Sequence, residues 1–204
     1  MRTLVSKELS LLPVTLSLSF GKGAMNLMNT PFDYGKLAYD RTEIADALYR
    51  YAAGLDLGDA DLLSSAFTED VIFDFASAAS KIGVQFPVLS ARDVVVKTLL
   101  AVLGPLDTSH SLSNLRMTIS GERATLQAYV LAQHFSPGEG PRPDQSRHAL
   151  LMGRYDASLV RDAELWRISR LTIDTVWFEG DPTIVTALPA GSLWKAEESI
   201  EKTR

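Results

Sequence analysis

The chain has 204 residues, of which 46 % are hydrophobic and 22 % charged, and its formal net charge is −5. These values predict one globular domain with tails rather than two domains. The negative charge and the scattered Lys and Arg residues argue against nucleic acid as a partner, because phosphate binding needs a clustered basic face. The sequence has no cysteine, which excludes disulfides, thiolate metal sites and cysteine nucleophiles.

The first 37 residues are predicted to be an extension that is partly disordered. Residues 9–20 are rich in Leu and Ser and faintly resemble the apolar part of a signal peptide, but Glu8 and Pro13 interrupt the pattern. We therefore expect a cytoplasmic protein. No apolar run approaches the roughly 20 residues that a membrane-spanning helix needs, so we expect no membrane partner.

Helical spacing of apolar residues predicts three helices in the first half of the domain, at residues 41–55, 60–67 and 91–103. Asp40 or Thr42, Asp59 and Ser90 are the expected N-terminal caps of these helices. A short β-rich run at 71–75 lies between them, and residues 76–90 are predicted to form a loop that contains Pro87.

The second half alternates with a period of two, which indicates strands at residues 109–120, 124–135, 146–161 and 165–178. A Pro- and Gly-rich loop is expected at 136–144, and a C-terminal tail at 181–204. Helices followed by antiparallel strands predict an α+β fold with the helices on one face of a curved sheet. Such a sheet must enclose either a filled core or a cavity.

Strict alternation divides the strand at 109–120 into two faces. Leu115, Met117 and Ile119 fall on one face, and His110, Asn114 and Arg116 fall on the other. Strands 124–135 and 146–160 carry apolar residues on both faces, which predicts that both faces of the sheet are covered and that the protein forms a homo-oligomer.

Four short motifs lie in order along the domain: residues 51–59 continuing to 66–70, residues 108–114, residues 153–156 and residues 165–168. Their order and spacing resemble the SnoaL-like family of the nuclear transport factor 2-like superfamily, over about residues 38–180. This family includes polyketide cyclases, scytalone dehydratase, bacterial bile-acid dehydratases and hexachlorocyclohexane dehydrochlorinase. The resemblance implies a cone-shaped, strongly curved mixed or antiparallel sheet with the N-terminal helices packed across its concave face around a pocket. It also implies a homodimer or homotrimer.

The dehydratase-like branch of the family carries an Asp just after the first helix and a His at the start of a strand, and Asp56 and His110 match these positions. Tyr51, five residues before the Asp, matches the bile-acid dehydratase-like members. In dehydrochlorinase-like members this position is Lys, and their late basic residue falls here near Ile173 or Asp174. Halide elimination is therefore not favoured.

The chemistry of these residue types supports the same site. A carboxylate fixes the tautomer of a His and stabilises its protonated form, and base catalysis contributes about 10²–10⁴-fold. A Tyr hydroxyl can stabilise the enolate oxygen that forms on deprotonation. His110 is thus predicted to be the general base, Asp56 its partner and Tyr51 the donor to the substrate oxygen. Each also has a structural alternative: His110 as a hydrogen-bonded polar residue, Asp56 as a helix end and Tyr51 as a core aromatic.

Five further residues are predicted to line the pocket: Phe67, Phe73, Asn114, His148 and Trp177. The aromatic residues among them could equally be core, and Asn114 could pair with the backbone. His134, just before the Pro- and Gly-rich loop, is expected to be exposed. Three scattered His residues do not have the spacing of a metal site, and the sequence contains no phosphate-loop, flavin or nicotinamide fingerprint, so no metal or other cofactor is expected.

The predicted function is a cofactor-independent lyase or isomerase that abstracts a proton α to a carbonyl of a hydrophobic polycyclic or aromatic substrate. An aldol-type polyketide cyclase and a non-catalytic ligand-binding or accessory protein of the same fold are the alternatives. A His110–Asp56 contact that opens into a cavity of about several hundred Å³ would favour an enzyme. A cavity filled by Phe and Leu side chains would favour a binding or structural role.

Overall fold

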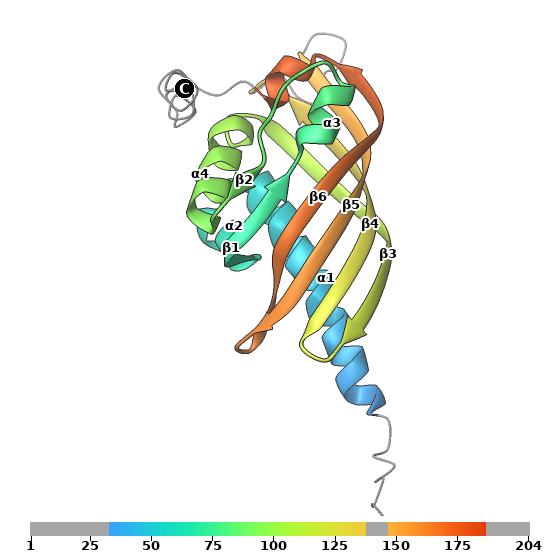
Figure 1. Ribbon diagram of the computed structural model, residues 1–204. Coiled ribbons are helices and arrows are strands. Elements are labelled where there is room, and N and C mark those ends of the chain that lie inside the picture. The colour runs from blue at the N-terminus through green and yellow to red at the C-terminus, as the bar shows by residue number, and fades with distance from the viewer. Residues whose placement is uncertain (1–32, 138–146, 187–204) are drawn as a thin grey trace, which may run out of the picture. The chain divides into compact units, whose positions relative to one another are not determined.

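The computed structural model describes residues 33–137 and 147–186, in which helices lie against a six-stranded sheet (Figure 1). Along the chain the elements are α1 (Tyr34–Asp56), α2 (Ala60–Ser65), β1 (Phe67–Asp74), α3 (Ala76–Lys81), β2 (Leu89–Ser90), α4 (Arg92–Leu103), β3 (Asp107–Ser120), β4 (Arg123–Phe135), β5 (His148–Asp162), β6 (Leu165–Gly180) and a 3₁₀ turn, η1 (Pro182–Val185). The predicted α+β class is confirmed. Residues 1–32 of the expected extension and most of the expected tail lie outside the described residues, whereas residues 34–37 of that extension belong to α1.

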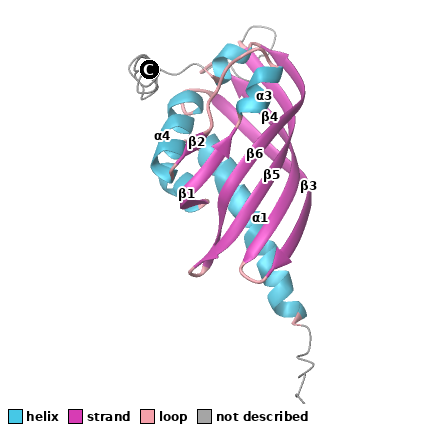
Figure 2. Ribbon diagram, in the orientation of Figure 1, coloured by secondary structure: helices cyan, strands magenta, loops and turns pink. Residues whose placement is uncertain are grey.

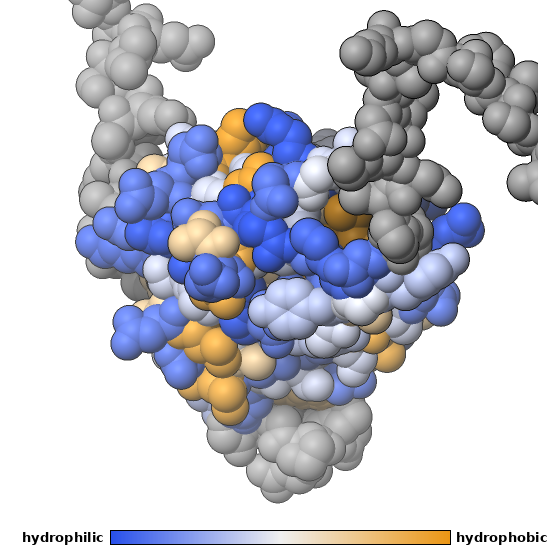
Figure 3. Space-filling view, turned by 90° about the horizontal axis from the view of Figure 1, so that it is seen from below, coloured by the Kyte–Doolittle hydropathy of each residue, from blue (hydrophilic) through white to orange (hydrophobic). Residues whose placement is uncertain are grey.

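The sheet has the order β2-β1-β6-β5-β4-β3 and does not close on itself. Strands β3 to β6 pair antiparallel with their neighbours, whereas β1 runs parallel to β6, so the sheet is mixed (Figure 2). Helix α1 lies along one face and packs against β3 and β6. α3 and η1 lie at one end of the sheet, and the β3–β4 and β5–β6 turns lie at the other. Seen from this turn end, the surface is mostly hydrophilic with separate apolar areas (Figure 3).

Helix α1 is longer than predicted because Asp40 does not cap it. The Asp40 side chain is buried inside the helix and accepts hydrogen bonds from Lys36 one turn earlier and from Arg161 on β5. The Arg161 guanidinium in turn lies 4.8 Å from the centre of the Trp166 ring. A buried carboxylate is tolerated only when it is paired in this way. The cluster therefore attaches the first half of α1 to the β5–β6 hairpin.

Two elements were not predicted between β1 and α4. The run Ala76–Lys81 forms α3, whose first free amide, that of Ala76, donates to the Asp74 carboxylate. Leu89 and Ser90 form the short strand β2, so that Ser90 does not cap α4. Instead Ala91 precedes α4 with a φ of 71°, and its amide donates to Val71 on β1. Both elements are too short to produce a readable period in the sequence.

Strand β3 contains a β-bulge that corrects the predicted division of its faces. Ser113 pairs with Tyr129 and Arg116 pairs with Gln127, so that two residues of β3 stand opposite one residue of β4. Asn114 has a φ of 54°, in the left-handed region that Asn tolerates better than most residues. The extra residue changes the phase of the alternation. His110 therefore faces the helices together with the Leu115, Met117 and Ile119 half of the strand, while Asn114 is exposed.

Small inward-facing residues on β4 and β5 leave room between the sheet and the helices. Along β4 every second residue from Ala124 to His134 is buried, and along β5 every second residue from Ala149 to Leu159 is buried. The small members of these rows are Ala124, Ala128, Ala132, Ala149, Gly153 and Ala157. Bulkier side chains from α1, α4 and β6 occupy part of this space, and a pocket remains at the end near α3.

We expect Gly54→Ala to lower the free energy of unfolding by about 1–3 kcal/mol, although Ala is the better helix former. A Cβ atom at this position would lie 2.6 Å from the backbone nitrogen of Leu63 on α2. The added methyl group must push α2 away from the end of α1. Urea unfolding monitored by circular dichroism measures the effect. The exposed Thr42→Ala on the same helix is the control, and equal stability of the two variants would contradict close α1–α2 packing.

Candidate active site

His110 and Asp56 form a hydrogen-bonded pair between the end of α1 and the edge strand β3. Nδ1 of His110 lies 2.6 Å from Oδ1 of Asp56. The backbone amide of His110 donates to Oδ2 at 2.8 Å, and the Thr108 hydroxyl donates to Oδ1 at 2.8 Å. Asp56 is the last residue of α1, so the length of this helix places its carboxylate at the unpaired edge of β3. One carboxylate thus binds both the His ring and the strand that carries it.

The hydrogen bonds of Asp56 keep it ionised. Burial by itself would raise the pKa of this carboxyl, but the contacts from the His110 ring, the His110 amide and Thr108 outweigh burial and hold the pKa below its ordinary value. An ionised carboxylate only accepts hydrogen bonds, so Nδ1 of His110 carries the proton of this contact. The other ring nitrogen, Nε2, is then the one that can accept a proton or a hydrogen bond, and the His110 side chain lines the pocket.

The pocket beside His110 is small and mostly apolar. Its volume is about 60 Å³, below the roughly 300–1,000 Å³ of common small-ligand sites. Four polar side chains line it, those of Tyr51, His110, His134 and Tyr155. The apolar side chains come from β1, α4, β4, β5, β6 and the segments at the α3 end, and are those of Phe73, Phe75, Phe86, Leu99, Val102, Leu103, Ala132, Leu151, Ile173, Phe178 and Val185.

His134, which we expected to be exposed, is buried in the wall of the pocket next to His110. Only 5 % of it is exposed, and the two imidazole rings meet edge to face with their centres 5.2 Å apart. Burial, followed by the neighbouring His110, lowers the pKa of His134 to about 4. Nδ1 of His134 lies 3.1 Å from the carbonyl oxygen of Ala149, which can only accept. His134 is therefore neutral, with Nδ1 protonated and Nε2 available as an acceptor.

Tyr51 reaches the same pocket from α1. It is 2 % exposed and packs edge to face on Phe67 and on Tyr155, with ring centres 5.8 Å apart in both pairs. Burial, and then the neighbouring Tyr155, raise the pKa of the Tyr51 hydroxyl well above its ordinary value. Tyr51 thus stays a protonated hydrogen-bond donor near neutral pH.

The other predicted pocket residues are spread over the domain. Phe73 lines the pocket. Phe67 is fully buried behind Tyr51 and does not line it. Asn114 and Trp177 lie on the outer face of the sheet, and Trp177 is 47 % exposed. The His148 ring packs against Phe135, with ring centres 5.7 Å apart, and is also not part of the lining.

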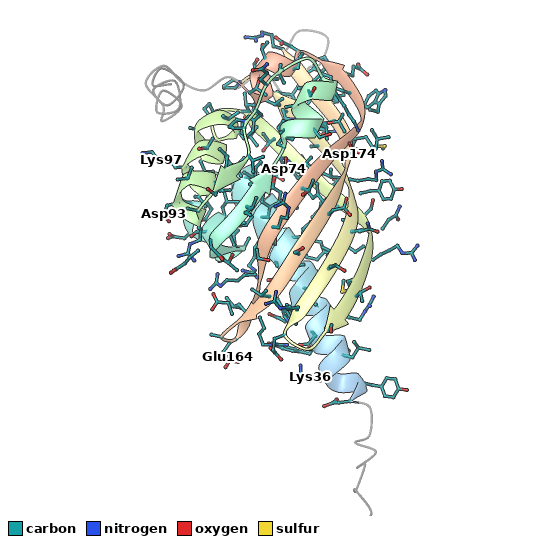
Figure 4. All side chains as sticks on the ribbon, viewed as in Figure 1. Lys36, Asp74, Asp93, Lys97, Glu164 and Asp174 are labelled. Carbon is teal, nitrogen blue, oxygen red and sulfur yellow. The ribbon has the colours of Figure 1, made fainter. Side chains whose placement is uncertain are left out.

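Two register shifts in the sheet explain why Asn114 and Trp177 do not line the pocket. The bulge at Asn114 turns that side chain outward, as described above. A second register shift, between the Met152–Trp177 and Gly153–Thr175 pairs, puts Trp177 beside Met152 on the outer face and leaves Phe178 pointing inward. Asp174 also lies on the outer face, where it accepts from Lys81 and from Arg154 (Figure 4). A bulge carries no clear sequence signal, so period-two alternation assigns these side chains to the wrong face.

Within residues 33–137 and 147–186 no group of three or more His, Asp or Glu side chains could hold a metal ion. In the same part of the chain, no helix has the length and apolar character needed to cross a bilayer.

The SnoaL-like domain model matches residues 37–172. A curated relative, terrestric acid biosynthesis cluster protein E of Penicillium crustosum, is 35 % identical over 145 residues, which cover 70 % of this chain and 86 % of the relative. The solved structure of the Kfla4162 protein of Kribbella flavida superimposes with a TM-score of 0.63 at 30 % identity, covering 74 % of this chain and 99 % of that one. A candidate scytalone dehydratase of Novosphingobium aromaticivorans superimposes with a TM-score of 0.59 at 23 % identity, over 72 % and 91 % of the two chains.

The chain belongs to the SnoaL-like family, and its fold is the cone of the nuclear transport factor 2-like superfamily. The resemblance found in the four sequence motifs is thereby confirmed.

The buried neutral His134 makes the stability of the fold depend on pH. The pKa of His134 is about 4 in the folded protein, whereas in the unfolded chain it has the ordinary value of 6.5. Between pH 4 and pH 6.5 the unfolded chain therefore binds this proton more strongly than the folded protein does. Stability is therefore full above about pH 6.5 and falls towards pH 4, by at most about 1.4 kcal/mol per pH unit. Urea unfolding at pH 7, 6 and 5 measures this slope. His134→Gln, which keeps a donor for Ala149, should remove most of it, and an unchanged slope in that variant would contradict a buried neutral His.

Proposed function

We propose that the protein is a cofactor-independent lyase or isomerase of the dehydratase type, which removes a proton α to a carbonyl group in a hydrophobic substrate. The observation that carries the proposal is the His110–Asp56 pair, in which a 2.6 Å contact occupies Nδ1 of a His that lines an apolar pocket and leaves Nε2 as the proton acceptor. A fixed tautomer, a carboxylate partner and the exclusion of water are what proton abstraction by a His requires.

In the proposed first step, Nε2 of His110 takes the proton from the carbon next to the carbonyl. The C–H electron pair moves towards the carbonyl carbon and the oxygen gains negative charge, which the Tyr51 hydroxyl stabilises by donating a hydrogen bond. Asp56 stabilises the imidazolium that forms, because its Oδ1 accepts from the protonated Nδ1. A donor aimed at a developing oxyanion contributes about 3–4 kcal/mol in other enzymes.

In the second step the enolate electrons form a carbon–carbon double bond and a β-hydroxyl leaves with its bonding pair. The imidazolium of His110 returns its proton to this oxygen, so that water is released and the base is restored. If the proton returns to a carbon instead, the double bond has moved and the reaction is an isomerisation. If the enolate attacks a second carbonyl, the product is the aldol ring of a cyclase.

The lining of the pocket favours an uncharged substrate. Of the side chains that line it, none is Lys, Arg, Asp or Glu, and His134 is held neutral. An ionised group brought here would lose its hydration without gaining an opposite charge, which is costly. The relative from Penicillium crustosum is named for the biosynthesis of a small molecule, terrestric acid, and this supports a biosynthetic intermediate as substrate.

The small volume of the pocket favours the second candidate, a ligand-binding or accessory protein without catalysis. Phe and Leu side chains fill much of the space, and Phe75 packs edge to face on Phe86 with ring centres 5.6 Å apart. A substrate with a ring requires these aromatic side chains to move. Turnover separates the two candidates, because a binding protein needs the same movement but no base.

We expect His110→Ala to reduce turnover by about 10²–10⁴-fold while the melting temperature changes by only a few degrees. Asp56 keeps its contacts with Thr108 and with the backbone of residue 110 in this variant. Proton NMR in deuterium oxide, with a panel of neutral cyclic β-hydroxyketones, detects α-deuteration and loss of the hydroxyl. Ser111→Ala, the outward-facing neighbour on β3, is the control. Wild-type rates in His110→Ala would exclude this base, and unfolding of that variant would indicate a structural role.

We also propose that the protein assembles into a homodimer or homotrimer through the outer face of the sheet. Leu131 on β4, Met152 on β5 and Trp177 on β6 stand side by side in register, and Tyr129 lies next to them. Each is between 38 % and 47 % exposed. Adjacent large apolar side chains on an exposed sheet are typical of an interface between proteins.

Met152→Glu is expected to convert this oligomer into monomers, because it places a charge in the middle of the apolar row. Sedimentation velocity measures the change. Val94→Glu, an equally exposed apolar position on α4, should leave the mass unchanged. A monomeric wild type, or a Met152→Glu variant with the wild-type mass, would contradict this interface.

A further inference from the structure

Thr108 on β3 contacts the His110–Asp56 pair but has no role in the proposed mechanism. Its hydroxyl donates to Oδ1 of Asp56 at 2.8 Å, and the same oxygen lies 2.6 Å from Nδ1 of His110. Thr108 and His110 lie on the inner face of β3, whereas Ser109 between them is exposed. One strand therefore supplies both the proposed base and a second donor to the partner of that base.

The two oxygens of the Asp56 carboxylate have different partners. Oδ2 accepts from the backbone amide of His110 at 2.8 Å, and this contact attaches the end of α1 to the strand. Oδ1 binds both the Thr108 hydroxyl and the His110 ring. Each carboxylate oxygen offers about two acceptor positions, so the hydroxyl takes one position on Oδ1 and leaves the other for the ring. The hydroxyl thereby determines the direction from which the ring can bind.

The position of Asp56 at the edge of the sheet makes such a constraint necessary. Its side chain is 24 % exposed, whereas that of His110 is 3 % exposed. The terminal torsion of a carboxylate is broad, so a half-exposed Asp can turn towards water and away from an imidazole. The His110 amide on Oδ2 and the Thr108 hydroxyl on Oδ1 hold both oxygens. The plane of the carboxylate is therefore fixed by β3 without any help from the ring.

The hydroxyl also affects where the proton between Asp56 and His110 resides. Burial raises the pKa of the Asp56 carboxyl, but the contacts with His110 and then with the Thr108 hydroxyl hold this pKa below its ordinary value. A carboxylate oxygen that already accepts a hydrogen bond is a weaker base. Oδ1 therefore leaves the proton on Nδ1 of the ring, as the proposed proton abstraction at Nε2 requires.

The other titratable groups around the His110 ring are uncharged. Burial lowers the pKa of His134 to about 4 and raises the pKa of the Tyr51 and Tyr155 hydroxyls, so all three are neutral near pH 7. The side chains that α4 and β6 contribute to the lining of the pocket are apolar. Stabilisation of the imidazolium thus depends on Asp56, and therefore on the groups that hold Asp56 in place.

We propose that Thr108 is a positioning residue of the active site, whose hydroxyl fixes the Asp56 carboxylate and thereby the orientation and the tautomer of the His110 ring. The inference rests on the proposed function for the reaction that the pair catalyses. Thr108 does not line the pocket, so it acts through Asp56 and not on the substrate. A β-branched Thr has few side-chain rotamers in a strand, so its hydroxyl is held in place better than that of a Ser.

The fold of this corner does not by itself require the hydroxyl. The His110 amide already attaches α1 to β3, and the following helix, α2, is capped by Asp59. Because Asp56 is partly exposed, water can replace the Thr108 hydroxyl as a donor to Oδ1. Water satisfies the oxygen without fixing its direction. Removal of the hydroxyl should therefore impair the orientation of the pair and leave the domain folded.

The first test is the kinetics of Thr108→Val, which keeps the shape of the side chain and removes the hydroxyl. With a neutral cyclic β-hydroxyketone as substrate, kcat should fall about 10- to 100-fold, because the base is less well oriented. KM should be nearly unchanged, because Thr108 does not line the pocket. Thr108→Ser should recover most of kcat. Thr118→Val, the same substitution at an exposed position of the same strand, is the control and should behave as the wild type.

The second test needs no turnover and follows the pair by NMR. In Thr108→Val the pKa of the Asp56 carboxyl, measured by carbon-13 titration, should rise towards its ordinary value. The proton signal of His110 Nδ1 should broaden through faster exchange with water, and Thr108→Ser should restore both signals. An Asp56 pKa and an Nδ1 signal that do not change in Thr108→Val overturn the proposal, as does wild-type kcat in that variant.

The same variants distinguish positioning from a structural role and from failure of the proposed function. Unfolding of Thr108→Val, seen in its melting temperature, would assign Thr108 a structural role and overturn the proposal. If the wild type turns over no ketone, the proposed function fails, whereas the NMR signals of Asp56 and His110 still decide whether Thr108 holds the pair.

Discussion

The structure depends above all on the hydrogen bonds that converge on the Asp56 carboxylate. This one group receives the amide and the imidazole of His110 and the hydroxyl of Thr108, and it does so at the open edge of the sheet. An edge amide would otherwise need water or another strand as partner. Asp56 thus joins the end of α1 to β3 and holds the His110 ring through the same carboxylate.

The arrangement also keeps the carboxylate charge apart from the apolar pocket. Asp56 lies at the edge, where its carboxylate is 24 % exposed, while the His110 side chain it orients is only 3 % exposed. The negative charge stays near water, while the His110 imidazole ring reaches inward. Burying the carboxylate itself would have cost several kcal/mol and raised its pKa. The imidazole ring of His110 thus separates the Asp56 charge from the pocket.

Sequence reasoning predicted the order of the large elements because their periods extend over ten or more residues. It also selected Tyr51, Asp56 and His110; Tyr51 and His110 line one pocket, and Asp56 contacts His110 from outside the lining. It failed where the structure depends on single residues. The phase change at Asn114 and the shift near Met152 reversed the expected faces of Asn114 and Trp177.

His134 shows a different reason for failure. The Pro- and Gly-rich segment that follows it suggested a surface position, yet strict alternation along β4 puts His134 on the same face as Ala132 and Val130. The alternation along β4 thus indicates a buried His134, whereas the adjacent loop favours an exposed one. Tyr155 lies in one of the four motifs but received no predicted role, because nothing in the sequence shows that its ring packs on Tyr51 of the distant helix α1.

The bulge on β3 has a consequence for how this pocket can change over time. The half of β3 before Asn114 carries His110, whereas the half after it carries core residues, and the surplus residue separates them. Loss of that residue would leave a regular strand in which both halves keep their inward faces. Elsewhere on the strand a change of one residue in length would turn one half inside out. The bulge is therefore the point at which this strand can lose a residue without moving the half that carries His110 to the outer face of the sheet.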